Sequence, residues 1–466
     1  MDKTSKRMIK VLIAFSTLFI SLMVYLSYFE IFQSSKIVNN NYNKRQWINE
    51  EYVLRGIIAD RNGKTLTYSE KKENGQVRYY PFKEVYSHII GYSFKEYGKA
   101  GLESSYNKEL LHIKENPIQE ITEKIIGPKE KGNNLILAID HEIQSYAEEK
   151  LRGKKGAIVL LNPKNGEIYA MVSKPDFDPS TIKKQWNEII EDKNSPLLNR
   201  ATMGLYAPGS IFKTITATAA LENKDVEKTF DCKGSINIDG YILKDYKGVA
   251  HGKLDMKRAL EVSCNVFFSQ IGLKLGEEKL RNTAENYMFN KHVPFDLQVK
   301  KSIFPKINMT RPELGASAIG QGKILVTPLN MAMVAGAIAN DGEMMKPILV
   351  KEVIDPKGRT IKMNHSQVLS KTSSKVVAEE IKTMMISVVE KGSGKNARIK
   401  NIKVAGKTGT AENQTEKEHG WFIGFAPAND PKVAIAVVLE NIGITGGKSA
   451  APIARDVMAT ALNRLR

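Results

Sequence analysis

One uncharged apolar run near the N-terminus divides this chain into a part that can lie in lipid and a part that must fold in water. Val11–Phe29 contains 19 residues and no Asp, Glu, Lys or Arg. At about 1.5 Å per residue, a helix of this length nearly spans the hydrocarbon core of a bilayer. The residues just before the run are basic: Lys3, Lys6, Arg7 and Lys10.

Basic flanks of membrane segments stay on the cytoplasmic side. We therefore expect residues 1–10 to form a cytoplasmic tail, 11–29 a single transmembrane anchor, and the remainder to lie outside the cytoplasm. A cleavable signal peptide is the alternative. The run is long for a signal peptide, however, and no small-x-small cleavage site follows Phe29, so a retained anchor is favoured.

The composition narrows the possible partners. The chain has 466 residues, which allows two or three domains, and a net charge of +18. The lysines are scattered and often lie beside glutamates, which indicates either a solvated basic surface or attraction to anionic lipid or an acidic polymer. Nucleic acid is not expected, because no stripe of alternating aromatic and basic residues is present.

The cysteine and histidine content argues against a metal or other cofactor. Cys232 and Cys264 are the only cysteines, and the seven histidines form no His-Glu-x-x-His motif. We therefore expect no metal site and no cofactor. A disulfide between Cys232 and Cys264 stays open, because the compartment outside the cytoplasm permits one.

The pattern of apolar and turn residues predicts an α+β fold. After a polar linker at Gln33–Asn49, a strand enters an Asn-Gly turn within Gly56–Gly63, and Asp140 caps a helix that follows another strand. We expect residues 30–155 to form the linker and a pedestal, and 156–466 a second domain closed by its own C-terminus. Its predicted elements are a hairpin at 157–172, helices at 213–221, 328–340 and 450–465, and a strand at 433–439.

The first motif that carries chemistry is Ser210-Ile211-Phe212-Lys213. The Pro-Gly pair before it predicts that Ser210 lies at a helix N-terminus, where unpaired N–H groups favour developing negative charge. Lys213 follows at i+3 on the same face, and its apolar neighbours lower its proton affinity, as a base requires. An ordinary N-cap serine with a surface lysine would explain this motif if it stood alone.

The second motif is Ser263-Cys264-Asn265, which precedes the apolar start of a helix. One interpretation is a capping turn, with Ser263 or Asn265 accepting the helix N–H groups. The other is a catalytic turn in which a hydroxyl passes a proton and an amide binds a substrate carbonyl. Cys264 is assigned no role.

The third motif is Lys407-Thr408-Gly409-Thr410, in a segment that alternates small and polar residues. Glycine within a strand lets another backbone approach closely. Lys407 could then bind a carboxylate while the N–H of Thr410 is directed at an oxyanion. A glycine-rich loop with a solvated lysine is the alternative. In combination, the three motifs predict a serine acyl-transfer site.

In this order the motifs resemble those of the active-serine penicillin-recognising enzymes. The chain is similar to class B penicillin-binding proteins, which are membrane-anchored D,D-transpeptidases of bacterial wall synthesis. The resemblance implies a transpeptidase domain with an antiparallel sheet flanked by helices and a helical subdomain, on a dimerisation-like pedestal. Further segments carry it: Arg55–Gly63, Gly101-Leu102-Glu103 with Tyr106, Asn199–Ala201, Tyr206–Ser210, Gly320–Gly322 with Thr327-Pro328, and Trp421–Phe425.

The resemblance implies catalytic roles. Ser210 attacks the carbonyl of a terminal D-Ala-D-Ala and becomes acylated, and Lys213 accepts its proton. Ser263 and Asn265 relay the proton and position the donor peptide, and Lys407 completes the catalytic set. β-Lactams would be trapped at Ser210.

The resemblance also implies how the donor is bound. The terminal carboxylate lies against Lys407 and the Thr408-Gly409-Thr410 segment. The backbone N–H groups of Ser210 and Thr410 form the oxyanion hole. The amine of a second stem peptide then resolves the acyl-enzyme and makes the cross-link.

Other functions compete with this one. A bifunctional enzyme needs a glycosyltransferase domain, for which residues 30–155 offer too little room, so the resemblance implies a SEDS-family membrane polymerase as partner. A serine β-lactamase or D,D-carboxypeptidase would use water in place of the amine. A β-lactam sensor or a catalytically silent scaffold would transfer the acyl group neither to an amine nor to water. The third residue of the stem peptide, and a role in division, elongation or sporulation, stay open.

Overall fold

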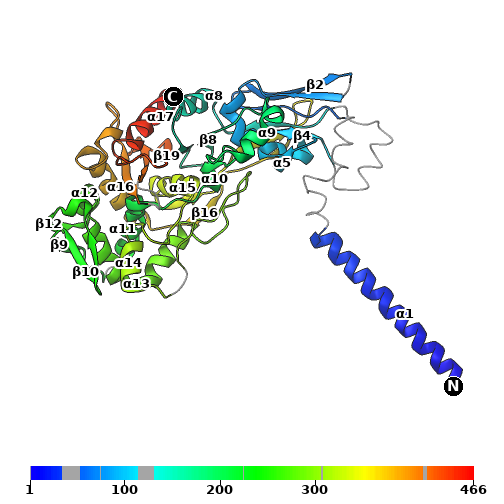
Figure 1. Cartoon of the computed structure of the whole chain (residues 1–466), viewed down its shortest axis with the longest axis horizontal. Helices are drawn as coiled ribbons and strands as arrows, with labels where there is room; N and C mark the ends of the chain where they lie inside the picture. The colour runs from blue at the N-terminus through cyan, green and yellow to red at the C-terminus, as the bar shows by residue number, and fades with distance from the viewer. Residues whose placement is uncertain are drawn as a thin grey trace.

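The computed structural model describes residues 2–33, 53–73, 75–113, 131–223, 225–305, 308–412 and 417–465 (Figure 1). The predicted linker at Gln33–Asn49 lies outside the described residues, except for Gln33 at its start. The described part consists of an N-terminal helix, a pedestal and a larger α+β domain.

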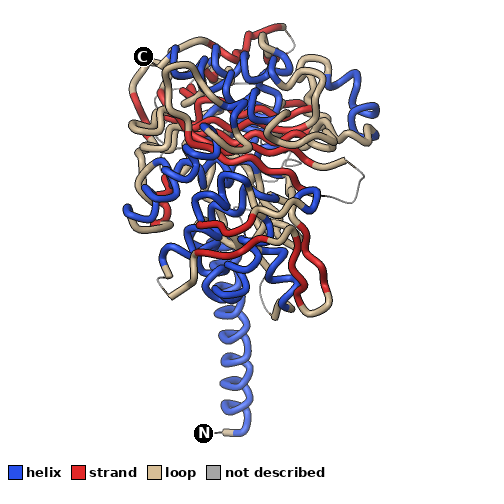
Figure 2. The backbone as a smooth tube through the Cα atoms, turned by 90° about the vertical axis from the view of Figure 1, so that its left-hand side faces the viewer, coloured by secondary structure: helices blue, strands red, loops and turns tan. Residues whose placement is uncertain are grey.

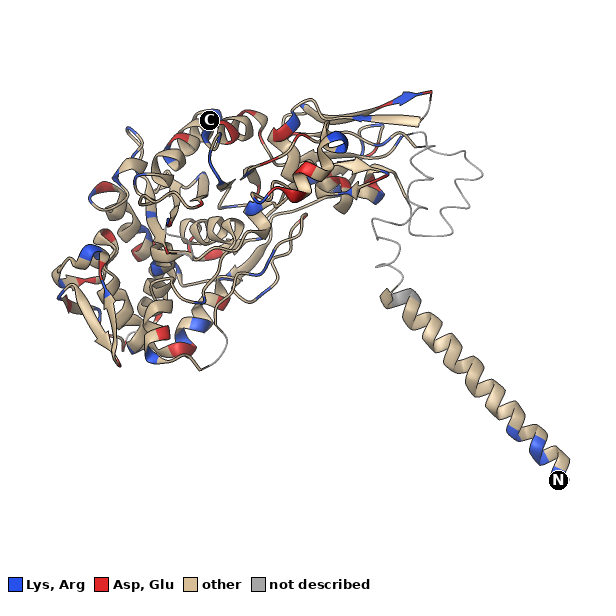
Figure 3. Cartoon of the chain, viewed as in Figure 1, with Lys and Arg blue, Asp and Glu red and all other residues tan. Residues whose placement is uncertain are grey.

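The N-terminal helix α1 spans Lys3–Tyr28, so it begins inside the predicted tail. Among the described residues it is the one helix long and apolar enough to cross a membrane, with a mean hydropathy of 2.2. Its basic residues gather at its N-terminal end and the rest of its length carries no charge (Figure 3). All its described side chains are exposed, so this apolar surface has no protein core to cover it.

A five-stranded antiparallel sheet forms the centre of the larger domain, in the order β17-β18-β19-β7-β8. The first and last strands of the domain are therefore neighbours, as expected for a domain closed by its own C-terminus. β17, which carries the Lys407 motif, lies at one edge. The bounds are β7 Gly156–Leu161, β8 Ile168–Lys174, β17 Ala405–Ala411, β18 His419–Ala426 and β19 Val433–Leu439.

Helices cover both faces of this sheet (Figure 2). One face packs against α8 (His141–Lys150) and α17 (Ala450–Arg464). The other packs against α11 (Lys213–Glu222), α15 (Pro328–Ala339) and α16 (Lys375–Glu390). β19 reads as a continuous apolar run because both of its faces are buried.

A helical subdomain lies beside α11. It consists of α12 (Met256–Val262), α13 (Asn265–Asn286) and α14 (Arg311–Ser317). Two small antiparallel sheets complete it. One pairs β9 (Thr229–Cys232) with β12 (Gly252–Asp255), and the other is the hairpin of β10 (Ser235–Ile238) and β11 (Tyr241–Lys244). The Ser263 motif falls at the junction of α12 and α13, so the subdomain brings that motif towards α11.

The pedestal is built on a six-stranded sheet in the order β15-β14-β6-β1-β2-β3. Four strands come from residues 58–137, and two come from residues 350–363, which the sequence places in the catalytic domain. The boundary at 155/156 stays a prediction. The bounds are β1 Ile58–Ala59, β2 Thr65–Lys72, β3 Gly75–Tyr79, β6 Asn134–Leu137, β14 Val350–Ile354 and β15 Thr360–Met363.

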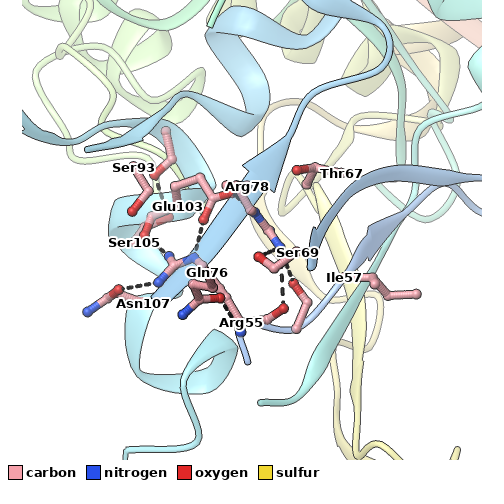
Figure 4. Close-up of polar contacts among 12 residues, drawn as sticks. Arg55, Ile57, Thr67, Ser69, Gln76, Arg78, Ser93, Glu103, Ser105 and Asn107 are labelled. Carbon is pink, nitrogen blue, oxygen red and sulfur yellow. Dashed lines mark hydrogen bonds and ion pairs between the residues drawn. The ribbon is translucent and has the colours of Figure 1, made fainter. Parts of the chain in front are cut away.

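A buried ion-pair network connects this sheet to the short helix α5 (Gly101–Ser105). Glu103 lies between the guanidinium groups of Arg55 and Arg78, and Arg55 also donates to Asn107 Oδ1 at 2.7 Å (Figure 4). Burial alone would raise the pKa of Glu103, but the two guanidinium charges hold its pKa below the ordinary value. The network therefore explains why the segments at Arg55 and Gly101–Glu103 lie together.

Candidate active site

The nucleophile turn is fixed by close backbone contacts. Ser210 lies in the short 3₁₀ turn Gly209–Phe212, which runs directly into α11, so it stands just before the helix N-terminus. Gly209 has a φ of +55°, and a Cβ there would lie 2.5 Å from the carbonyl oxygen of Thr410. Only glycine permits both the conformation and the contact. The Gly209 N–H also donates to the Gly320 carbonyl at 2.9 Å.

The edge strand β17 approaches this turn from the other side. A Cβ on Gly409 would lie 2.9 Å from the Pro208 carbonyl oxygen, so this glycine admits the turn against the strand. Ser210 and Thr410 are therefore carried by two backbones in direct contact. This contact is what an oxyanion hole made from their two N–H groups requires.

Lys213 is fully buried one turn after Ser210 and contacts the second motif. Its Nζ donates to Ser263 O at 2.7 Å and to Asn265 Oδ1 at 2.6 Å, and lies 3.4 Å from Ser263 Oγ. Burial lowers the pKa of Lys213 to about 8, although the charge of Asp245 acts in the opposite direction. A substantial fraction of this amine is therefore neutral near physiological pH, as a general base must be.

Lys407 is also fully buried and approaches Ser263 from β17. Its Nζ donates to Ser263 Oγ at 2.8 Å and to Thr408 O at 2.9 Å. Burial, together with the nearby charge of Lys213, holds the pKa of Lys407 well below its ordinary value. A carboxylate ligand would raise this pKa again, so the charged form of Lys407 would be favoured beside such a ligand.

The fold thus joins the three motifs at one hydroxyl. Ser263 Oγ lies between the amines of Lys213 and Lys407, and both Ser263 and Asn265 are held by Lys213. Ser263 has a φ of +62°, a left-handed conformation that ends α12 and turns the hydroxyl towards both lysines. A hydroxyl that can accept from one amine and donate to another is suited to proton relay.

Asp245, which no motif of the sequence marks, holds the second motif in place through its carboxylate. This buried carboxylate accepts the backbone N–H of Asn265 and the thiol protons of Cys264 and Cys232, the thiols at 2.9 and 3.1 Å. Burial alone would raise the pKa of Asp245, but the bonds that it accepts hold the pKa below the ordinary value. Nothing in the local sequence marks this aspartate, because its partners are distant along the chain.

Cys264 has a structural role that we did not predict. Its Sγ accepts the Phe267 N–H at 3.3 Å, so Cys264 caps α13. The alternative interpretation of the second motif, in which Ser263 or Asn265 supplies the cap, does not hold. Burial and the neighbouring Asp245 raise the pKa of the Cys264 thiol. Both cysteines are free thiols, so the open possibility of a disulfide is not realised in this structure.

Four metal-ligating groups meet at this point: the side chains of Cys232, Asp245, His251 and Cys264. Their ligand atoms all lie within 4.8 Å of one another, and only His251 is not buried. If the two thiols lose their protons to a metal ion, two thiolates, one imidazole and one carboxylate form a donor set that Zn²⁺ accepts in tetrahedral sites. The expectation of no metal rested on spacing along the chain, which does not report this convergence.

The donor set predicts about one zinc ion per purified chain, because it supplies the four ligands that a structural zinc site requires. Elemental analysis by mass spectrometry, after dialysis against metal-free buffer, measures this. Replacing Cys232 with serine should lower the zinc content, whereas serine in place of an unrelated buried residue should not. Zinc-free protein with two titratable thiols would contradict the prediction.

Thr408 on β17 is buried, and its Oγ1 lies 2.6 Å from the Oγ of Ser393. Thr410 Oγ1 accepts the Gly446 N–H at 3.4 Å. A Cβ on Gly446 would lie 2.2 Å from the Gly409 carbonyl oxygen, so the segment after β19 packs directly on the motif. The roles assigned to Thr408, Gly409 and Thr410 in binding the donor stay predictions.

The fold and this constellation define a serine acyl-transfer enzyme of the penicillin-recognising class. Two family models match: the penicillin-binding protein transpeptidase domain over residues 156–459 and the penicillin-binding protein A dimerisation domain over 55–135. The chain therefore belongs to the penicillin-binding protein transpeptidase family. The resemblance inferred from the motifs is confirmed.

Individual relatives agree with this assignment. The peptidoglycan D,D-transpeptidase PbpA of Mycolicibacterium smegmatis is 32% identical over 97% of this chain and 98% of its own length. Stage V sporulation protein D of Bacillus subtilis is 32% identical over 84% of this chain and 64% of its own length. The ceftriaxone acyl-enzyme complex of penicillin-binding protein A from M. tuberculosis superposes with a TM-score of 0.83, at 32% identity over 89% of this chain and all of that one.

Proposed function

We propose that this protein cross-links peptidoglycan by D,D-transpeptidation through an acyl-enzyme at Ser210. The observation that carries the proposal is the Ser263 hydroxyl, which contacts the buried amines of Lys213 and Lys407 beside the nucleophile turn. A serine beside two buried amines, one of which has its pKa lowered to about 8, is suited to acyl transfer at neutral pH.

The first half-reaction follows from these contacts. Neutral Lys213 takes the Ser210 proton as Oγ attacks the penultimate D-Ala carbonyl, and the N–H groups of Ser210 and Thr410 stabilise the oxyanion. The tetrahedral intermediate collapses when the C–N bond breaks. The proton then passes from Lys213 through Ser263 to the leaving D-Ala nitrogen, which restores the neutral lysine.

The second half-reaction reverses these steps with a new nucleophile. The amine of a second stem peptide attacks the Ser210 ester, loses a proton to Lys213 and forms the cross-linking amide. Ser210 leaves as an alkoxide and recovers its proton from Lys213. In the donor complex the terminal carboxylate lies on Lys407, with Thr408 and Thr410 on either side of Gly409.

The cellular arrangement is part of the proposal. The basic N-terminal end of α1 stays in the cytoplasm and the catalytic domain lies outside the bacterial cell membrane. The pedestal within residues 30–155 and the domain from 156 then stand at a fixed reach above the lipid. A SEDS-family polymerase would supply the glycan strands, since neither domain is assigned to glycosyl transfer.

Transfer to an amine and transfer to water are separated by one assay. The full chain in detergent is incubated with a stem pentapeptide ending in D-Ala-D-Ala and an amine acceptor, and the products are followed by mass spectrometry. Cross-linked product supports the transpeptidase. Tetrapeptide alone would favour a D,D-carboxypeptidase, and rapid turnover of benzylpenicillin would favour a β-lactamase. Absence of any reaction with the peptide or with benzylpenicillin would favour a scaffold.

A further inference from the structure

Ser393 lies on a turn that no motif of the sequence marked. The turn follows α16, and its serine is exposed while its partner Thr408 is buried. The two hydroxyl oxygens are 2.6 Å apart. Ser393 is therefore an exposed group in direct hydrogen-bond contact with the residue beside Lys407.

The turn is clamped between two elements of the site. The Ser393 N–H donates to the Glu261 carbonyl at 3.3 Å, two residues before Ser263. A Cβ on Gly392 would lie 2.2 Å from the same carbonyl oxygen, and a Cβ on Gly447 would lie 2.5 Å from the Ser393 carbonyl oxygen. Glycine at both positions permits this packing.

A second contact holds α12 against α16. Glu261 is buried, and its Oε2 accepts from Ser387 Oγ at 2.5 Å. Through its N–H and its Oγ, Ser393 thus bridges the element that carries Ser263 and the strand that carries Thr408. A shift of α12 would therefore move Ser393, and through Ser393 it would move the Thr408 hydroxyl on β17.

The chemistry of paired hydroxyls decides what the contact does. Each hydroxyl has one proton to donate and two lone pairs. When Ser393 donates to Thr408, the Thr408 proton is left for a ligand oxygen, and a hydrogen bond to a carboxylate is among the stronger kinds. The reverse orientation would occupy the Thr408 proton within the protein.

We propose that Ser393 is a positioning residue for the carboxylate of the donor peptide and of β-lactams. It donates to Thr408 and so orients the Thr408 proton towards the ligand. This inference rests on the proposed function, because it takes Thr408 as a carboxylate-binding residue. It predicts an effect on recognition of the carboxylate and none on the bond-making step at Ser210.

The test compares benzylpenicillin with its methyl ester, which lacks the charged carboxylate, using the full chain in detergent. Ser393→Ala should raise the dissociation constant of the non-covalent benzylpenicillin complex about five- to tenfold, the range of one hydrogen bond. Its acylation rate constant should stay unchanged, and the ester should react as it does with wild type. Ser393→Thr keeps the hydroxyl and should behave as wild type, as should Ser180→Ala, at an exposed serine on the loop before α9 (Ile182–Glu191).

Two results would overturn the proposal. If Ser393→Ala weakens the binding of benzylpenicillin and of its methyl ester equally, Ser393 has only a structural role. If Ser393→Ala weakens the binding of neither compound, Ser393 has no role in recognising the carboxylate. Thr408→Val separates this inference from the proposed function. If Thr408→Val removes the preference for the acid and Ser393→Ala does not, only the inference fails, whereas if neither removes it, the proposed role of Thr408 fails as well.

Discussion

Ser210→Ala should abolish covalent capture of benzylpenicillin and all cross-linking. The hydroxyl oxygen forms the bond to the acyl group, and no other group on the nucleophile turn can replace it. Removing a catalytic serine lowers turnover by about 10⁴-fold or more. Intact-protein mass spectrometry after incubation with benzylpenicillin measures the adduct directly.

The fold should tolerate this change, which makes the result interpretable. Ser210 is only half-buried, and alanine suits the short turn into α11. The melting temperature should therefore stay close to that of wild type. Ser263→Ala is the matched control, since it removes a neighbouring hydroxyl but keeps the nucleophile, and it should slow acylation without abolishing the adduct. A stable benzylpenicillin adduct on the Ser210→Ala variant would contradict the assignment of Ser210 as the nucleophile.

The acylation rate should rise with pH through about 8 and level off above it. Burial lowers the pKa of Lys213 to about 8, and only the neutral amine can accept the Ser210 proton. The sign follows from this: as pH rises through the pKa, the neutral fraction grows and so does the rate. Stopped-flow acylation by a chromogenic cephalosporin, measured from about pH 6 to pH 10, gives the profile.

Lys213→Arg provides the decisive comparison. A guanidinium stays protonated throughout this pH range, so it keeps the positive charge but cannot act as a base. The variant should lose about 10²- to 10⁴-fold in acylation rate, and the rise near pH 8 should vanish. A variant that keeps the rise would show that the titrating base is another group, with Lys407 the first candidate.

The same pKa shift has a consequence for stability. A lysine whose folded pKa lies below its unfolded value is harder to keep charged in the folded state, so its charge opposes folding at any pH where both states are protonated. Its penalty is full below about pH 8 and fades as the pH rises towards the unfolded pKa of about 10.4. Lys213→Met should therefore be more stable than wild type near neutral pH, although it is inactive.

The sequence predicted the parts of the site whose chemistry is local. A serine and a lysine one turn apart, or a lysine between glycines, can be recognised from residue types alone, and the structure brings Ser210, Lys213, Ser263, Asn265 and Lys407 together. The N-terminal helix α1 and the apolar strand β19 were predictable for a similar reason, because a continuous apolar run has few alternatives.

What escaped prediction depends on contacts between distant segments. Asp245 accepts the backbone N–H of Asn265, which lies 20 residues later in the chain. The Ser393 hydroxyl contacts the Thr408 hydroxyl from a glycine-rich turn whose sequence is typical of a surface loop. Cys264 caps α13 through its sulfur, a residue type that capping preferences do not favour. Strands β14 and β15 join the pedestal sheet although their sequence lies far along the chain.

That last pairing makes the pedestal and the catalytic domain a single mechanical unit. The chain leaves the catalytic domain after α15, adds β14 and β15 to the pedestal sheet beside β6, and returns to form α16. A fragment that begins at residue 156 would lack β6, the strand with which β14 pairs. The exposed edge of β14 would then be prone to aggregation. In the intact protein, the chain crosses between the pedestal sheet and the catalytic domain more than once, so a displacement of the pedestal is transmitted to the catalytic domain through covalent connections on both sides of β14 and β15.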